Sequence, residues 1–299
     1  MSLTTLRQML LEAHDLRAGV AALNVISLEH AAAITDGAVS AGRPVVLQLS
    51  ENTIGFHGGA LEPIAAACRK LAEAAPVPIA LHLDHVTSVQ GCQVAGDLGF
   101  GSVMFDGSGA PYRENVALTA AVTVWAHAHG LIVEAELGRI GGKDGIHAPG
   151  ARTDPAEARA FVEETGVDAL AVAIGTSHAM PGREAVLDLD LLGRLRTQVP
   201  VPLVLHGSSG LTDERIVQAL DHGITKVNVA TQLNQAMTAA VRTVLRDDPS
   251  TVDPRSYLRA GREAMAARAS RLVQLIASPR AGASDIIDGD GPFDHADSA

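Results

Sequence analysis

The chain has 299 residues, 47% hydrophobic but only 3% aromatic, and its formal net charge is -11. This length suits two small domains or one large α/β barrel, and the shortage of aromatic residues predicts an aliphatic core. The acidic balance, without a block of lysines or arginines, argues against a nucleic-acid partner, because neutralising a phosphate backbone needs a clustered basic surface. A small anionic ligand remains compatible, since a few arginines and backbone amides can hold a single phosphate.

Cysteine content and hydropathy bear on where the protein works. Cys68 and Cys92 are the only cysteines, so no disulfide framework is expected and a cytosolic setting fits. The first 14 residues resemble an amphipathic helix with acidic residues rather than a secretory signal. No apolar run reaches the roughly 20 residues that span a membrane. We therefore expect a soluble cytoplasmic protein that binds neither membrane nor nucleic acid.

Eight short apolar runs alternate with helical patterns along the chain. Strands are predicted over residues 19–25, 44–50, 78–84, 102–105, 131–137, 169–174, 201–205 and 225–229. Helices are predicted over 27–41, 61–75, 88–98, 112–129, 154–164, 187–199 and 213–221, with a last long helical region from about 231. Strict βα alternation implies a parallel sheet, and eight units favour closure into a (β/α)8 TIM barrel over residues 1–280.

An open, doubly wound sheet is the competing fold. It would usually carry a glycine-rich dinucleotide fingerprint after the first strand, but residues 24–27 contain no glycine, so the barrel is favoured. Residues 138–152, after the fifth strand, are rich in glycine and suit a mobile flap. A second long loop spans 175–185, and the Gly/Asp-rich tail 281–299 is predicted to be disordered.

Polar and ionisable side chains concentrate where the predicted strands end, which is where barrel enzymes build their active sites. In chain order these residues are Asn24, Ser50, Asp84, His85, Asp106, Glu134, Glu136, His178, His206, Gly207, Asn228 and Thr231. His85, His178 and His206 leave different strands. Any one of them alone would more often pack or cap a helix, but three converging imidazoles would form an open Zn²⁺ site. Glu134 and Glu136 share a face and could ligate a displaced metal position.

Two small-residue segments follow the last two strands. Residues 206–210 read HGSSG and residues 228–231 read NVAT. The usual phosphate site of a barrel lies after strands seven and eight, where small residues expose backbone N–H groups. A tight turn that needs glycine would explain HGSSG equally well by itself, and only its place after strand seven favours a phosphate site.

Several motifs together resemble the class II, metal-dependent fructose-bisphosphate and tagatose-bisphosphate aldolases. They are LHLDH, VEAELGRIGG, AVAIGTSHAM, VPLVLHGSSG, TKVNVAT and DPRSYLRAGREAM, and the likeness runs from about residue 22 to 276. The chain length is closer to the shorter, tagatose-type branch. The resemblance implies a homo-oligomeric (dimeric or tetrameric) lyase of carbohydrate metabolism, in glycolysis for the fructose substrate. It would reversibly cleave fructose or tagatose 1,6-bisphosphate into dihydroxyacetone phosphate and glyceraldehyde 3-phosphate, or cleave another phosphorylated ketose.

The resemblance also assigns roles to individual residues. It implies a catalytic zinc ion on His85, His178 and His206, with Glu136 as a further or alternating ligand, and a second divalent or monovalent cation near Asp106 and Glu134. Asp84 would be the acid/base for the C4 hydroxyl, and Asn24 and Ser50 would contact the substrate. One phosphate would lie in a cradle of Gly207, Ser209, Asn228 and Thr231, and Arg255 would bind the second phosphate, often across a subunit interface.

Two positions depart from the family pattern. Family flaps commonly carry acidic residues after the glycine pair, whereas here Lys143 and Asp144 follow, so Asp144 would have to remove the C1 proton of dihydroxyacetone phosphate. Ala179 replaces the glycine that usually follows the strand-six histidine, which puts a backbone contact to the second cation in question. Either change is compatible with an altered substrate.

Three other functions fit parts of the pattern. A Schiff-base aldolase needs a buried strand lysine, and Lys226 is the sole candidate. A metal-dependent hydrolase or deaminase barrel also uses histidines and aspartates at the strand ends, but the paired phosphate segments speak against it. A sugar-phosphate-binding barrel without catalysis would keep the metal ligands and lack the flap base.

Overall fold

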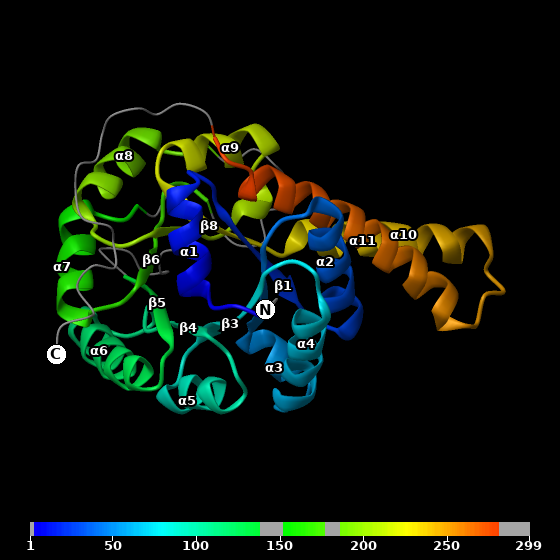
Figure 1. Cartoon of the computed structure of the whole chain (residues 1–299), viewed down its shortest axis with the longest axis horizontal. Helices are drawn as coiled ribbons and strands as arrows, with labels where there is room; N and C mark the ends of the chain where they lie inside the picture. The colour runs from blue at the N-terminus through cyan, green and yellow to red at the C-terminus, as the bar shows by residue number, and fades with distance from the viewer. Residues whose placement is uncertain (1–2, 138–151, 177–185, 281–299) are drawn as a thin grey trace.

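The computed structural model describes residues 3–137, 152–176 and 186–280. In this part of the chain, eight parallel strands pair in sequence order, and β8 pairs with β1 to close the barrel (Figure 1). The strands are β1 (Val20–Val25), β2 (Val45–Ser50), β3 (Ile79–Val86), β4 (Ser102–Phe105), β5 (Ile132–Glu136), β6 (Ala169–Ala171), β7 (Leu203–Leu205) and β8 (Ile224–Val229). The predicted (β/α)8 barrel is confirmed, and all eight predicted strands are present.

Helices surround this barrel and cover its outer face. Those of the described residues are α1 (Leu6–Asp15), α2 (Leu28–Ala41), α3 (Glu51–Phe56), α4 (Glu62–Ala74), α5 (Val89–Asp97), α6 (Tyr112–Ala128), α7 (Pro155–Thr165), α8 (Leu189–Gln198), α9 (Asp213–Asp221), α10 (Thr231–Asp247) and α11 (Pro254–Ala277). Short α3 was not predicted. Within the described ranges, none of these helices combines the length and hydropathy that crossing a membrane requires.

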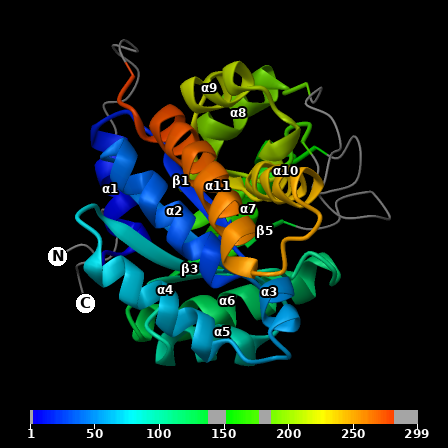
Figure 2. The ribbon, with the colours of Figure 1, turned by 90° about the vertical axis from the view of Figure 1, so that its right-hand side faces the viewer.

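The last helical region divides into two helices, which the sequence-based prediction treated as one. Residues 248–253 form a turn, and α11 then begins with Asp253 as N-cap and Pro254 in its first turn. Proline cannot continue a helix but suits the first helical position. Helices α10 and α11 pack against each other and project from the side of the barrel as an arm (Figures 1 and 2).

The inside of the barrel changes from apolar to polar along the strands. Because strand side chains alternate, residues two apart share a face. The inward series run Ala22–Asn24 on β1, Val46–Gln48–Ser50 on β2, Ala80–His82–Asp84 on β3 and Ile132–Glu134–Glu136 on β5. Helix α1 packs Leu6, Met9 and Leu10 against the apolar ends. One end of the barrel is therefore closed by an apolar plug, which leaves the polar end for a site.

Candidate active site

A pocket of about 430 Å³ opens at the carboxyl ends of the strands. This size is typical of sites for small molecules. Its lining includes eight predicted site residues: Asn24, Ser50, Asp84, His85, Gly207, Ser209, Asn228 and Thr231. It also includes residues to which the sequence assigned no role, namely Ile26, Gln48, Asn52, Thr53, Phe56 and Ala230. Most of the predicted substrate contacts thus share one cavity.

An irregular backbone brings Asp84 and His85 to the same pocket. In a regular strand these neighbours would point to opposite faces. Here the pairing of β3 with β4 shifts register between Leu83 and Val86, and His85 has a φ of 53°. A left-handed conformation costs a non-glycine residue free energy and often marks a functional position. The sequence placed His85 just beyond the strand, whereas it lies within β3 at this irregularity.

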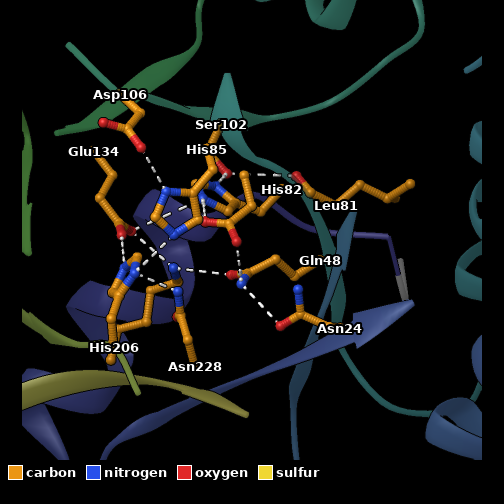
Figure 3. Close-up of polar contacts among 12 residues, drawn as sticks. Asn24, Gln48, Leu81, His82, His85, Ser102, Asp106, Glu134, His206 and Asn228 are labelled. Carbon is orange, nitrogen blue, oxygen red and sulfur yellow. Dashed lines mark hydrogen bonds and ion pairs between the residues drawn. The ribbon is translucent and has the colours of Figure 1, made fainter. Parts of the chain in front are cut away.

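His85 lines the pocket, and the imidazole of His206 lies beside it with the two rings nearly perpendicular, at 82° (Figure 3). His85 Nε2 lies 3.1 Å from His206 Nδ1. The other nitrogen of each ring lies 2.9 Å from a carboxylate, Asp106 for His85 and Glu134 for His206. When each ring donates its proton to that carboxylate, the two remaining lone pairs point at each other. Such an arrangement needs a proton or a metal ion between the rings.

The charges around His85 show how strongly this position attracts a cation. Burial opposes protonation, but Asp84, the hydrogen bond to Asp106, and the charge of Glu136 raise the pKa of His85 to about 10. Burial likewise opposes ionisation of Asp106, yet its contacts with His85 and Ser108 hold its pKa well below the ordinary value. The pocket floor is therefore strongly anionic, as a binding site for a divalent cation requires.

The residues present fit a zinc ion. Two nitrogens on a tetrahedral zinc ion at about 2.0–2.1 Å lie about 3.3–3.4 Å apart, close to the observed separation. One potential ligand atom each from Asp84, His85 and His206 lies within 4.8 Å of the others, and the same holds for His85, Asp106 and Glu136. Metal-bound histidines commonly donate their second ring proton to a carboxylate, as both do here. The predicted third histidine, His178, lies outside the described residues, as do Asp144 and Ala179.

Asp84 combines one fixed oxygen with one that is available. Gln48 Nε2 donates to Asp84 Oδ2 at 2.9 Å and to Asn24 Oδ1 at 3.2 Å. Asp84 Oδ1 is buried and has no hydrogen-bond partner within the described ranges. A buried carboxylate oxygen without a donor carries a free-energy cost that a substrate hydroxyl could remove.

Below the pocket, a buried lysine connects several of these groups. Lys226 Nζ donates to Glu134 Oε2 at 2.8 Å and to Gln48 Oε1 at 3.1 Å, and its side chain is fully buried. Burial opposes ionisation of Glu134, but Lys226 and the bond from His206 lower its pKa well below the ordinary value. Figure 3 shows Gln48 and Glu134 on opposite sides of this network.

His82 belongs to the barrel interior. Its side chain is fully buried, and its Nδ1 lies 2.8 Å from Ser102 Oγ. Burial and the nearby charge of Lys226 lower the pKa of His82 to about 3, so the ring is neutral. His30 is also buried, at 6% exposed, with its ring nitrogens near Ser27 and Asn234.

The segments after β7 and β8 form a joined wall of the pocket. Gly207 has a φ of 65°, a left-handed conformation that favours glycine, and leads into a short 3-10 turn, Ser208–Gly210. Ser208 Oγ donates to the Asn228 carbonyl at 2.5 Å, which ties the two segments together. Thr231 begins the 17-residue helix α10, so the N-terminus of a helix meets this wall. Exposed N–H groups at such an end favour an anion.

Arg255 is separate from this pocket. It lies in the first turn of α11, on the arm, where its Nη2 is 2.6 Å from Asp253 Oδ2 and its side chain is 83% exposed. It does not line the pocket of its own chain.

Gln48 and Lys226 are two of the site residues that sequence reasoning missed. Gln48 is a polar residue within the apolar run of β2, two residues before Ser50 and thus on its face. The two-residue alternation of strand side chains could therefore have indicated Gln48 as a pocket residue. Lys226 was noted only as a candidate for a Schiff base. No local pattern in the sequence indicated its contacts with Gln48 and Glu134.

Comparisons with known proteins identify the family. The family model described as fructose-bisphosphate aldolase class-II matches residues 4–280. A fructose-bisphosphate aldolase of Giardia intestinalis is 39% identical over 292 residues, covering 89% of this chain and 90% of the relative.

Solved structures give the same result. The YdjI aldolase from Escherichia coli K12 is 34% identical with a TM-score of 0.81, covering 93% of this chain and 98% of that one. A fructose-bisphosphate aldolase from Campylobacter jejuni superposes with a TM-score of 0.79 over 93% of this chain and 97% of that chain. Its identity is 23%, so this second likeness shows the fold alone.

A TIM barrel with this pocket and this family match defines a lyase that forms or cleaves a carbon–carbon bond in a sugar phosphate. The chain belongs to the class II fructose-bisphosphate aldolase family. Members of this family are metal-dependent and act on phosphorylated sugars, in accordance with the carboxylate-supported histidines described above.

Proposed function

We propose that this aldolase reversibly cleaves fructose 1,6-bisphosphate, or its C4 epimer tagatose 1,6-bisphosphate, to dihydroxyacetone phosphate and glyceraldehyde 3-phosphate. The observation that carries the proposal is the close approach of His206 Nδ1, at 3.1 Å, to His85 Nε2, where His85 lines one pocket with Asp84 and the wall after β7 and β8. This arrangement supports a metal position, an acid/base and an anion site that a single ketose phosphate could reach.

His85, His206 and the predicted His178 would hold the zinc ion, with Glu136 as a further ligand. When bound, the metal acts as a Lewis acid that polarises the substrate carbonyl. Asp106 and Glu134 were predicted near a second cation. Their contacts with His85 and His206 favour a different role, in which each carboxylate orients a histidine.

Asp84 would carry the proton of the C4 hydroxyl. In the cleavage direction its Oδ1 accepts that proton while the C3–C4 bond breaks, and in condensation it returns the proton to the new alcohol. Gln48 holds the other oxygen of Asp84, so the group keeps its orientation during the transfer. Asp144 on the flap would remove the C1 proton of dihydroxyacetone phosphate in condensation.

The phosphate of the dihydroxyacetone half would bind between Gly207, Ser209, Asn228 and Thr231, where two backbone segments and the start of α10 supply N–H and hydroxyl donors. Asn24 and Ser50 would contact the substrate from the β1 and β2 side.

Arg255 supports a homo-oligomer, either a dimer or a tetramer. An arginine that binds the second phosphate must reach a pocket, and Arg255 lies in the first turn of α11, on the projecting arm, instead of in its own pocket. We propose that it serves the pocket of a neighbouring copy. The prediction of a cytosolic protein is part of the same proposal and rests on the two unpaired cysteines.

The buried ion pair of Lys226 with Glu134 disfavours the Schiff-base alternative. A nucleophilic lysine must reach the substrate as a free amine, whereas this side chain is fully buried. Borohydride treatment in the presence of substrate is expected to leave Lys226 unmodified, and a stable adduct there would disprove the metal-dependent mechanism.

A coupled assay tests the proposed substrate directly. It compares fructose 1,6-bisphosphate, tagatose 1,6-bisphosphate and the corresponding monophosphates, each with and without a chelator. We expect activity with one bisphosphate that the chelator abolishes and added zinc restores. Activity that survives complete metal removal, or cleavage of monophosphates alone, would contradict the proposal.

A further inference from the structure

The ammonium group of Lys226 contacts two branches of polar side chains that end at different functional groups. One branch runs from Lys226 through Gln48 to Asp84, and the other runs through Glu134 to His206. We propose that Lys226 is a positioning residue of the aldol reaction, holding Asp84 for proton transfer and His206 for metal binding. This inference rests on the proposed function for the roles of Asp84 and His206.

The first branch depends on which way the Gln48 amide points. A glutamine side chain presents an acceptor oxygen and a donor nitrogen, and either could face Asp84. Lys226 has donors only, so its contact at 3.1 Å fixes the amide oxygen toward the lysine. The amide nitrogen must then face Asp84 Oδ2 and Asn24 Oδ1, as it does. Without Lys226 the amide could rotate and present its oxygen to the carboxylate.

The second branch depends on how Glu134 is shared. Its Oε2 accepts from Lys226 at 2.8 Å and its Oε1 accepts from His206 Nε2 at 2.9 Å. Because Nε2 carries the proton in this bond, Nδ1 is the unprotonated nitrogen and faces His85. A metal ion requires this tautomer of His206. Because Glu134 is 1% exposed, loss of Lys226 would remove the donor to its Oε2 and leave His206 as its remaining hydrogen-bond donor among the described residues. The carboxylate could then rotate about its side chain, and His206 would lose its fixed orientation toward the metal position.

The two branches predict two defects that can be separated. Hydrogen exchange at C1 of dihydroxyacetone phosphate needs the metal position and the flap base but leaves the C4 hydroxyl uninvolved. Cleavage of a ketose bisphosphate additionally needs Asp84. A fault in the Gln48 branch therefore lowers the ratio of cleavage to exchange. A fault in the Glu134 branch weakens metal binding, which chelator competition measures without substrate.

Four variants test these branches. We expect Gln48→Met to lower the cleavage-to-exchange ratio about 10- to 100-fold, because a small misplacement of a catalytic group has that effect. Glu134→Gln should raise the zinc dissociation constant about 10- to 100-fold, as loss of a histidine's supporting carboxylate does. Lys226→Met should show both defects. Adding Gln48→Met to Lys226→Met should lower the ratio no further, since the two positions act through one contact.

Controls separate positioning from misfolding. Lys70→Met removes an exposed lysine that pairs with a neighbouring glutamate on α4, and should change neither readout. If Lys226→Met does not fold because Glu134 has lost its lysine partner, Lys226→Met with Glu134→Gln removes both charges. This double variant should still show the lowered ratio, because Gln48 has lost its donor.

Two results would overturn the proposal. One is a folded Lys226→Met enzyme with the wild-type ratio and wild-type zinc affinity. The other is an equal loss of cleavage and exchange at unchanged zinc affinity, which a partly unfolded protein would also give. If the wild-type enzyme exchanges the C1 hydrogen but cleaves neither bisphosphate, the proposed substrate is wrong. Lys226→Met can then be compared with the Lys226→Met, Gln48→Met double variant on whichever ketose phosphate the enzyme does cleave.

Discussion

Replacing Asp106 tests whether this carboxylate supports His85 or binds a cation itself. Asp106 Oδ2 accepts from His85 Nδ1 at 2.9 Å, while Oδ1 accepts from the backbone and the hydroxyl of Ser108 at 3.1 and 2.6 Å. Asp106→Ala removes the group that orients the ring of a residue with a left-handed backbone. We expect the zinc dissociation constant to rise about 10- to 100-fold, which corresponds to about 1.4–2.8 kcal/mol.

Competition with a chromophoric chelator at fixed pH measures this affinity, and metal analysis gives the stoichiometry. Asp106→Asn is the matched variant, because its amide oxygen can still accept from His85 and should preserve part of the affinity. The reasoning would be refuted if Asp106→Ala bound zinc as tightly as the wild type. A loss of one full equivalent of a second cation, with the catalytic metal retained, would instead support the role that the family resemblance implied.

Three further outcomes follow from the structure. His206→Ala removes a predicted ligand, so metal analysis should find the one tightly bound zinc per wild-type chain missing, and equal loading of both proteins would refute the ligand assignment. Asp168→Ala should lower the free energy of unfolding by about 2–4 kcal/mol in urea titration, because this buried carboxylate accepts from the Val133 amide at 2.8 Å and also pairs with an arginine and a histidine. An unchanged midpoint and slope would show that these contacts contribute nothing net. Burial raises the pKa of Cys68 and Cys92 to about 12, so both thiols stay protonated at pH 8 and should react with a disulfide reagent only after unfolding; rapid labelling of the native protein would contradict this.

Much of the barrel could be predicted because its signals are local. Each strand is a short apolar run and each helix has its own period, so the alternation is visible without long-range contacts. The boundaries that failed have local causes as well. Pro254 divides the last helical region, and α3 is only six residues long, too short for a periodic pattern.

The candidate site could be predicted as a set of residues but not as a set of contacts. Parallel strands bring their carboxyl ends to one rim, so a polar residue after each apolar run indicated Asn24, Asp84 and His206 without knowledge of the packing. The irregular strand pairing at His85 could not be predicted from the sequence, because a register shift between β3 and β4 depends on both strands.

What the sequence alone determined is the fold class and the residue types that surround the pocket, because hydrophobic period and strand ends are properties of neighbouring residues. Only the tertiary structure decided which of those residues touch. Lys226 lies 178 residues from Gln48 and 92 from Glu134 along the chain, yet one ammonium group contacts both. Closure of the barrel places β2, β5 and β8 around one interior, and it is this closure that turns separate polar residues into a connected network.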